Sequence, residues 1–411
     1  MPSAISPQAA TGPHVALQTC VMRILITDGN ERVALAVARS LTRARHAVVV
    51  TAPTRLSLAG VSRGIRPRAL RADPLAEPAQ YAAELGRIAR DEDAAMVLPM
   101  TDASVEAVLE YRHALPPNIT VPFPDLETYR TASDKARLLA LAAASGFGVP
   151  ETRVIASPEN AAEVLRDSAF FPAIVKPHRS VVTAGSVRRK TQVTQVRDGA
   201  ACGRALAALP RAAFPVLLQR PVSGVGEGFF ALRWGGRMIA MFAHRRLREK
   251  PPAGGVSVYR ESIPLDRALV GPGVRLLETL GWQGVAMVEC KREHATGRPV
   301  VMEVNGRFWG SLQLAIDAGV DFPPLLVRCA AGETVPECGD YRLGVRSRWF
   351  WGDVDHLYLR WREAQVSSRL GALVDFFRVR PGRDRSEIAR WRDPVPFVVE
   401  TLQWLRILPQ M

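Results

Sequence analysis

The sequence predicts an α/β region followed by a two-lobed region of α+β structure. Apolar runs at 23–26 and 46–50 flank a segment at 33–41 with helical spacing, and this strand–helix–strand order is typical of a parallel sheet. From 171 to 222 the pattern changes to two strands, a helix and a further strand, which predicts a small α+β lobe. Because 411 residues are too many for one compact core, we expect two or three domains.

The opening unit has no G-x-G-x-x-G after its first strand, so it lacks the dinucleotide-binding fingerprint. A further buried strand at 94–99 is followed by Thr101 and Asp102. Side chains at the carboxyl ends of parallel strands commonly face ligands, so both residues are candidates for substrate contacts. The alternative is that they only cap the helix that follows.

The second region begins after proline-rich breaks at 115–117 and 122–124, with a helix that starts at Lys135. Its later elements are expected as a strand at 171–177 carrying Lys176, a polar turn at 180–185, a strand at 186–196, a helix at 202–208 and a strand at 216–222. A second lobe is expected from Gly224 to about residue 332.

A hairpin at 285–305 carries the strongest functional signal. Two apolar runs flank a polar segment with a glycine, so a turn centred on Thr296 sets Glu289 opposite Glu303. Alternation along the strand places Asn305 on the face of Glu303. Facing carboxylates destabilise a strand pair unless a cation lies between them, and hard oxygen ligands suit magnesium carried on nucleotide phosphates. We therefore predict a magnesium–nucleotide site. The alternative is an edge hairpin whose outer face is solvated.

The basic residues do not predict a nucleic-acid partner. The net charge is +14, but the 54 basic residues are almost all arginines, scattered without a long basic block. This bias is typical of a genome that favours arginine codons. Lysine is rare, which makes its positions informative, because a compact ammonium suits phosphate oxygens: Lys135, Lys176, Lys190, Lys250 and Lys291.

Cysteine spacing and hydropathy limit the class of protein further. The 5 cysteines are widely spaced without a C-x-x-C pair, which argues against a disulfide framework and a zinc site. No apolar run reaches the roughly 18 residues needed to span a bilayer, and 1–21 does not resemble a secretion signal. We expect a cytoplasmic protein with no membrane partner, a disordered leader at 1–21, and Met22 as an alternative start to Met1.

With these motifs, the sequence resembles the ATP-grasp superfamily, in particular its carboxylate–amine ligases and carbamoyl-phosphate-synthase-like members. The resemblance covers about 22–330 and is most specific at 289–311. It implies a Rossmann-like preceding domain at 22–120, an ATP-grasp small lobe at 128–222, a large lobe with the Mg-ATP site at 223–332 and a C-terminal extension at 333–411. The family's signature strand usually reads Glu-(Ile/Val)-Asn-Pro-Arg, and here it is Glu303-Val304-Asn305-Gly306-Arg307. Glycine in place of proline relaxes the backbone without removing a ligand.

The resemblance implies roles for individual residues. Glu289, Glu303 and Asn305 become the magnesium ligands, with Mn²⁺ able to substitute, and Arg307 neutralises the phosphate or an acyl phosphate. Lys135 matches a phosphate-contacting lysine, and Lys176 matches the lysine that reaches the α-phosphate and the adenine side. Residues of the family's hinge, whose backbone meets the adenine edge, match Gln219, Arg220 and Val222, and Glu227 is a candidate for contact with the ribose.

A basic block at 244–257 resembles the loop that closes over the reacting groups in ligase-like members. Gly254 and Gly255 allow backbone N–H groups to approach an anion, and Arg246 and Ser257 are candidates for substrate contacts. The alternative is a solvated basic turn.

The function implied by the resemblance is ATP-dependent ligation of a carboxylate to an amine through an acyl phosphate, with release of ADP and phosphate. Phosphoryl transfer depends mainly on positioning and charge neutralisation, which agrees with a magnesium clamp, two lysines and an arginine. The alternatives are a carboxylase-like enzyme that phosphorylates bicarbonate and a non-catalytic ATP-binding regulator. The expected partners are a small-molecule carboxylate and an amine. The aromatic segment at 346–356 is expected either to cap the active site or to mediate self-association as a homodimer.

Overall fold

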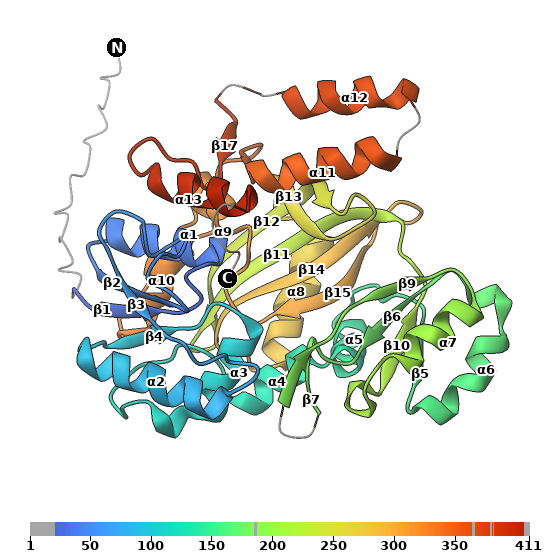
Figure 1. The fold of residues 1–411 in the computed structure, drawn as a ribbon, viewed down its shortest axis with the longest axis horizontal. Helices are drawn as coiled ribbons and strands as arrows, with labels where there is room; N and C mark the ends of the chain where they lie inside the picture. Colours follow the sequence, from blue (N-terminus) through green and yellow to red (C-terminus); the bar gives the residue numbers. More distant parts are fainter. Residues whose placement is uncertain (1–20, 185–186, 364–365, 379, 381, 407–411) are drawn as a thin grey trace, which may run out of the picture.

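The structure, a computed structural model, describes residues 21–184, 187–363, 366–378, 380 and 382–406. The leader expected at 1–21 therefore lies outside the described residues, apart from Val21. A large central sheet lies between an N-terminal part, a small lobe and a group of C-terminal helices (Figure 1). None of the described helices is long and apolar enough to cross a membrane.

The N-terminal part is a four-stranded parallel sheet with helices. Its strands, in the order β3-β2-β1-β4, are β1 (Arg23–Ile26), β2 (Ala47–Ala52), β3 (Ile65–Ala69) and β4 (Met96–Leu98). Its helices are α1 (Arg32–Arg43), α2 (Pro78–Asp91), α3 (Asp102–Glu110) and the 3-10 helix η1 (Arg112–Ala114). The predicted strand–helix–strand opening is confirmed, and its aliphatic strands are buried because helices cover a parallel sheet.

The small lobe is a four-stranded antiparallel sheet in the order β5-β10-β6-β9. Its strands are β5 (Thr152–Ile155), β6 (Ala173–Pro177), β9 (Thr194–Val196) and β10 (Val216–Gln219). Its helices are η2 (Pro158–Ala161), α6 (Ala162–Arg166), η3 (Ser168–Phe170), α7 (Gly199–Ala207) and η4 (Arg211–Ala213).

Two predicted elements of this lobe are wrong. The expected polar turn at 180–185 contains a strand, β7 (Val181–Ala184), which pairs with β8 (Val187–Lys190) in a separate hairpin. The single strand expected at 186–196 is consequently two, β8 and β9, because the chain leaves the hairpin before it joins the sheet. No glycine or proline marks this break at 191–193, so the sequence did not reveal the change of partner.

The large lobe is built on a seven-stranded sheet in the order β15-β14-β11-β12-β13-β16-β17. Its strands are β11 (Gly224–Trp234), β12 (Arg237–Lys250), β13 (Val256–Ser262), β14 (Gly284–Glu293), β15 (Pro299–Asn305), β16 (Arg346–Arg348) and β17 (Asp384–Ser386). Its helices are α8 (Arg267–Thr279), α9 (Leu312–Ala318) and α10 (Phe322–Ala330). Because β16 and β17 come from the C-terminal extension, that extension completes the sheet of the large lobe.

The rest of the extension consists of α11 (Phe350–Glu363), α12 (Val366–Phe377) and α13 (Val395–Trp404). Helix α11 packs against β12 and β13, which contain most of the loop predicted at 244–257 and leave only 251–255 as the connection between them. Arg248 and Lys250 of β12 form ion pairs with Asp353 and Asp355 of α11. The extension therefore holds the strand that leads into the loop.

Helices α4 (Leu126–Ser133) and α5 (Lys135–Ala144) join the parts. The start of α5 at Lys135 is confirmed, because the Asp134 carboxylate accepts hydrogen bonds from the first turn of the helix. The sequence places these helices in the small lobe, but Tyr129 and Leu138 belong to the core of the large lobe. Both helices contact β15, which brings Lys135 close to the predicted metal ligands.

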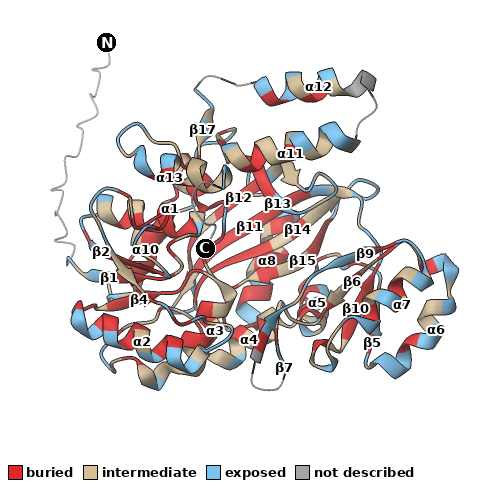
Figure 2. Cartoon of the chain, in the orientation of Figure 1, coloured by how far each residue is buried: buried red, intermediate tan, exposed pale blue. Residues whose placement is uncertain are grey.

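Apolar packing makes the N-terminal part and the large lobe continuous. One core cluster includes residues of β1 and α1 together with residues of α9, α10, β11 and β12. Buried positions gather on the central sheet and on the helix faces toward it (Figure 2). The small lobe has a separate core, and the pocket described next lies where it meets the rest of the molecule.

Candidate functional site

The predicted hairpin is confirmed in register as well as in type. Strands β14 and β15 pair antiparallel with Glu289 opposite Glu303 and Met287 opposite Asn305. Gly297, with φ +68, forms the turn, a conformation that favours glycine. A β-bulge follows Glu289, so the pairing shifts by one residue on the far side of the two glutamates.

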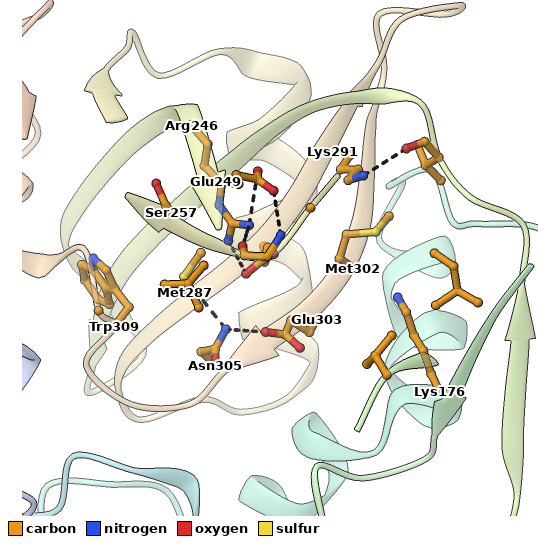
Figure 3. A pocket seen from close by; sticks show the side chains of 18 of the residues that line it. Lys176, Arg246, Glu249, Ser257, Met287, Lys291, Met302, Glu303, Asn305 and Trp309 are labelled. Carbon is orange, nitrogen blue, oxygen red and sulfur yellow. Dashed lines mark hydrogen bonds and ion pairs between the residues drawn. The ribbon is translucent and has the colours of Figure 1, made fainter. Parts of the chain in front are cut away.

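The two facing carboxylates are held by different partners. Arg246 of β12 places Nη2 at 2.6 Å from Oε2 of Glu289, and Asn305 Nδ2 donates a hydrogen bond to Oε1 of Glu303 at 3.0 Å (Figure 3). Burial raises the pKa of Glu289, Arg246 opposes that rise and the nearby Glu303 carboxylate adds to it. The hairpin thus concentrates negative charge, as expected from the sequence, and Arg246 supplies part of the compensation.

The residues of the hairpin fit a magnesium ion by their chemistry. Among the described residues, no group of three or more His, Cys, Asp or Glu side chains could hold a metal ion. The predicted set is of a different kind, since it combines two carboxylates with an amide. All three are hard oxygen donors of the kind that magnesium prefers. In the structure Asn305 Oδ1 accepts from Arg307 Nη2 at 3.1 Å, so its amide would rotate to offer oxygen to a cation beside Glu303.

One pocket of about 480 Å³ gathers most of the residues predicted from the sequence. Every predicted site residue lines it except Thr101, Asp102 and Glu227; those that do are Lys135, Lys176, Gln219, Arg220, Val222, Arg246, Gly254, Gly255, Ser257, Glu289, Glu303, Asn305 and Arg307. The small lobe, the large lobe and the start of α5 all contribute to this lining.

Asp102 and Thr101 lie next to the pocket and act through other residues. Both oxygens of Asp102 accept hydrogen bonds from Arg307, at 3.0 and 2.9 Å. Loss of solvent by itself raises the pKa of Asp102, but the Arg307 guanidinium beside it holds that pKa below its usual range. Thr101 caps α3, as the alternative interpretation had it, and its hydroxyl accepts from the Ser104 N–H. Both residues border a second cavity of about 580 Å³ against the N-terminal sheet.

Glu227 is not brought to the pocket. Its carboxylate accepts hydrogen bonds from Nε of Arg292, at 2.9 Å to both oxygens, and the side chain is buried. The carboxylate is therefore occupied within the protein, and the ribose contact expected from its glycine-flanked turn has no support in the geometry.

Cations and apolar side chains from both lobes line the pocket together. Lys135 Nζ donates to Ser180 Oγ at 3.2 Å, and Lys291 Nζ donates to the carbonyl of Val222 at 3.2 Å. Enclosure lowers the pKa of Lys176, which neighbouring Lys135 lowers further and Glu303 raises. Ile174, Val193, Val222, Met287 and Met302 provide the apolar surface. This combination suits a planar base with a phosphate tail.

Gln219, at the end of β10, keeps a free acceptor. Its Nε2 donates to Thr152 Oγ1 at 3.1 Å, whereas its buried Oε1 has no hydrogen-bond partner among the described residues. An amide oxygen in this position can accept from an exocyclic amino group. Arg220 points elsewhere, in an ion pair with Glu151 at 2.9 Å.

The loop between β12 and β13 forms one wall of the pocket. Gly255 N–H donates to Glu249 Oε2 at 2.9 Å, and its carbonyl accepts from Arg246 Nη1 at 3.1 Å. Gly254 has φ +129, and a Cβ on Gly255 would lie 2.3 Å from the Lys250 carbonyl oxygen. The paired glycines are therefore required by the shape of the loop.

Sequence reasoning missed several residues of the pocket. Met287 and Lys291 line it beside Glu289, and the period of two along β14 was a signal that could have identified both. Trp309, His244 and Arg32 also line it. Arg32 comes from α1, far away in sequence, so no local pattern could have indicated its position.

Gly306 has a packing role that the sequence did not suggest. A Cβ at this position would lie 2.5 Å from the ring of the buried Trp282 and 3.0 Å from Tyr129. Gly306→Ala should therefore destabilise the fold by about 1–3 kcal/mol through overpacking, measured by urea unfolding. The control is Gly371→Ala in α12, where a Cβ meets nothing within 4 Å and helix propensity favours alanine. Equal unfolding midpoints for wild type and Gly306→Ala would contradict this reason for the glycine.

Comparison with known proteins was informative for the fold. A family model described as "ATP-grasp in the biosynthetic pathway with Ter operon" matches residues 231–351. No curated protein matches the sequence.

Among solved structures, 397 chains are similar. The biotin carboxylase domain of 2-oxoglutarate carboxylase from Hydrogenobacter thermophilus, solved with MgADP, ADP and bicarbonate, has a TM-score of 0.61 at 16% identity, covering 80% of this chain and 74% of that chain. An L-amino acid ligase from Bacillus licheniformis has a TM-score of 0.57 at 16% identity, covering 76% and 75%. N5-carboxyaminoimidazole ribonucleotide synthetase from Thermus thermophilus has a TM-score of 0.56 at 18% identity, covering 79% and 81%. The resemblance found in the sequence is thus confirmed, and this chain has the ATP-grasp fold, with a Rossmann-like domain before its two lobes.

Proposed function

We propose that this protein is an ATP-dependent ligase that joins a small-molecule carboxylate to an amine. The observation that carries the proposal is the pocket, in which Glu289, Glu303 and Asn305 of the large lobe line the same space as Lys135, at the start of α5, and Lys176 of the small lobe. Each group matches a need of phosphoryl transfer, which depends on cations around the phosphates and on positioning of the reacting oxygens. The similar structures include a ligase and carboxylases, which supports the same class of chemistry.

In the proposed reaction, a carboxylate oxygen attacks the γ-phosphorus of ATP and ADP leaves with the electrons of the broken P–O bond. The amine nitrogen then attacks the acyl carbon, phosphate leaves, and the amine loses a proton to solvent or a nearby base. Magnesium, when held by Glu289, Glu303 and Asn305, neutralises phosphate charge. Mn²⁺ has the same preference for oxygen ligands and could replace it.

The chain's own residues supply the other contacts with the nucleotide and the reacting groups. Lys176 and Lys135 offer ammonium groups to the phosphates, and Gln219 Oε1 offers an acceptor to the adenine amino group. Arg307 is fixed by two hydrogen bonds to Asp102, so its guanidinium is held next to the proposed metal ligands without a search over rotamers. The loop at 251–255 keeps water from the acyl phosphate.

The test is a calorimetric titration with a non-hydrolysable ATP analogue, with and without magnesium, followed by ADP release in pools of carboxylates and amines. We expect magnesium-dependent binding, and ADP release that requires both a carboxylate and an amine. ADP release that depends on bicarbonate would identify a carboxylase-like enzyme. Binding without ADP release in any pool would identify a regulator, and absence of binding at millimolar analogue would exclude an ATP-dependent function.

Nucleotide affinity should fall at alkaline pH. The fall should begin at a lower pH than it would if the contact were made by a lysine with the usual pKa. The pKa of Lys176 lies below the usual 10.5 because of its enclosure, with Lys135 and Lys291 lowering it and Glu303 and Glu289 raising it. As pH rises through this lowered pKa the ammonium is lost, and with it a charge-assisted contact that contributes about tenfold or more in affinity. Titrations of the Mg-ATP analogue between about pH 7 and 10 measure this loss.

Lys176→Arg provides the control for the pH profile, because a guanidinium stays charged over the whole range. The profile of this variant should be flatter than that of wild type at alkaline pH. If both proteins lose affinity in parallel, the titrating group is not Lys176.

A further inference from the structure

Three buried polar groups at one end of the pocket have no hydrogen-bond partner among the described residues. They are Nδ1 of His244, Oγ of Ser257 and Nε1 of Trp309, and all three residues line the pocket. His244 and Trp309 are 0% and 1% exposed, and Ser257 is 8% exposed. Buried polar groups in native proteins nearly always have partners, so three orphans in one pocket need an explanation.

The packing holds these groups in place. The rings of His244 and Trp309 both lie against Phe230, with ring centroids at 4.6 and 4.5 Å. Ser257 lies opposite Glu249 in the β12–β13 pairing, beside Arg246. Ser257 and Trp309 are on the side of the pocket away from Lys176, with Arg246 and Met287 between (Figure 3). This end is therefore separate from the apolar surface that suits the base.

The chemistry of the three groups favours an anion. An indole N–H can only donate, and a serine hydroxyl can donate. Nε2 of His244 lies 2.9 Å from Ser311 Oγ, and in the tautomer that accepts a proton from the Ser311 hydroxyl at Nε2, Nδ1–H is a donor toward the pocket. Burial lowers the pKa of His244 well below its usual range, and the positive charges of Arg246 and Arg260 lower it further. The ring is therefore neutral. The three unpaired groups can all donate to a carboxylate, whereas the acceptors at this end, the carboxylates of Glu249 and Glu289, are already paired with Arg246.

We propose that this end of the pocket binds the carboxylate that is to be phosphorylated, with Trp309, Ser257 and His244 as neutral donors and Arg246 as the countercharge. The identity of the anion as the substrate carboxylate rests on the proposed ligase function, but the anion-binding property of the subsite does not. The carboxylate substrate is thereby assigned to this end of the pocket, and Glu289 and Glu303 lie between it and the nucleotide base. The amine is assigned to another part of the pocket.

The direct test follows the indole N–H of Trp309 by NMR. Protein labelled with ¹⁵N-tryptophan and saturated with the Mg-ATP analogue is titrated with acetate, and Trp309→Phe identifies the Trp309 signal by its loss. We expect that signal to shift with acetate, and the acetate affinity to fall about tenfold in Ser257→Ala. The Trp351 indole, which donates to Thr401 Oγ1 at 2.9 Å, should stay unmoved.

Ser347→Ala is the matched control, since Ser347 Oγ is also buried without a partner among the described residues but does not line the pocket. It should leave the acetate titration unchanged. A Trp309 signal that does not move with acetate overturns the proposal. So does an equal acetate affinity in Ser257→Ala and wild type.

A second arm separates this proposal from the proposed function. Hydroxylamine serves as the amine, because it converts an acyl phosphate to a hydroxamate, and free amino acids and short dicarboxylates serve as carboxylates. Trp309→Phe and Ser257→Ala should raise KM for the carboxylate about tenfold and leave KM for ATP unchanged. Acetate binding without hydroxamate formation in wild type would contradict the ligase and retain the anion subsite. Hydroxamate formation with unchanged carboxylate KM in both variants would retain the ligase and contradict the subsite.

Discussion

Glu303→Gln is expected to abolish carboxylate-dependent ADP release while the protein keeps its fold. The substitution removes one of the two facing negative charges proposed to hold magnesium, and loss of such an electrostatic contact costs at least about a hundredfold in turnover. The fold should persist because a glutamine oxygen can still accept the hydrogen bond from Asn305 Nδ2. ADP release and calorimetric binding of the Mg-ATP analogue measure the two expected losses.

Stability should change little while activity is lost. The Glu303 carboxylate raises the pKa of Glu289, so the two charges repel one another when no metal is bound, but Glu303 also attracts Lys176, Arg246 and Arg307. Without magnesium, Glu303→Gln should therefore unfold close to the urea concentration of wild type. Glu278→Gln, on the exposed side of α8, is the control for the chemistry of the substitution. Wild-type turnover in Glu303→Gln with magnesium present would remove Glu303 from the mechanism.

Glu387→Gln is expected to destabilise the protein by about 3–5 kcal/mol. Glu387 is buried and accepts hydrogen bonds from Arg32 of the N-terminal part, at 2.8 Å to both oxygens, and from Arg260 of β13. Arg260 is 0% exposed, and its removal from water is offset mainly by this carboxylate. A neutral amide would leave the guanidinium buried without a countercharge. Chemical unfolding measures the effect.

The control is an exposed pair of the same chemistry. Glu159 and Arg211 form an ion pair with side chains 59% and 82% exposed, so Glu159→Gln should leave the unfolding midpoint close to that of wild type. Equal effects of the two substitutions would mean that the buried Glu387 carboxylate contributes no more to the free energy of unfolding than an exposed ion pair does. In that case the C-terminal extension would not join the N-terminal part to the large lobe through Glu387.

The site was predicted best where it depends on local periodicity. Glu289 and Glu303 face one another because a glycine-containing turn joins two strands whose side chains alternate between the two faces. Both patterns can be recognised within about twenty residues of sequence. The rarity of lysine pointed to five positions, of which Lys135, Lys176 and Lys291 line the pocket, whereas Lys190 and Lys250 do not. The assignment of residue roles, however, rests on the resemblance to a family and remains a prediction.

The errors occur where neighbours in space are distant in sequence. Asp102 reached Arg307 across 205 positions, and Glu227 turned to Arg292 and away from the pocket. The strand at 181–184 was taken for a turn, although two valines and a threonine favour a strand, because so short a strand is fixed by the partner it pairs with.

By itself, the sequence determined the order of strands and helices in the opening unit, the hairpin with its two carboxylates, and the class of fold, because each depends on spacing within a short segment. Only the tertiary structure decided which cations compensate those carboxylates, that α4 and α5 join the large lobe, and that the C-terminal extension completes the central sheet. Those outcomes depend on which buried surfaces and charges meet after the chain has folded, and the energy of such contacts belongs to pairs of distant residues.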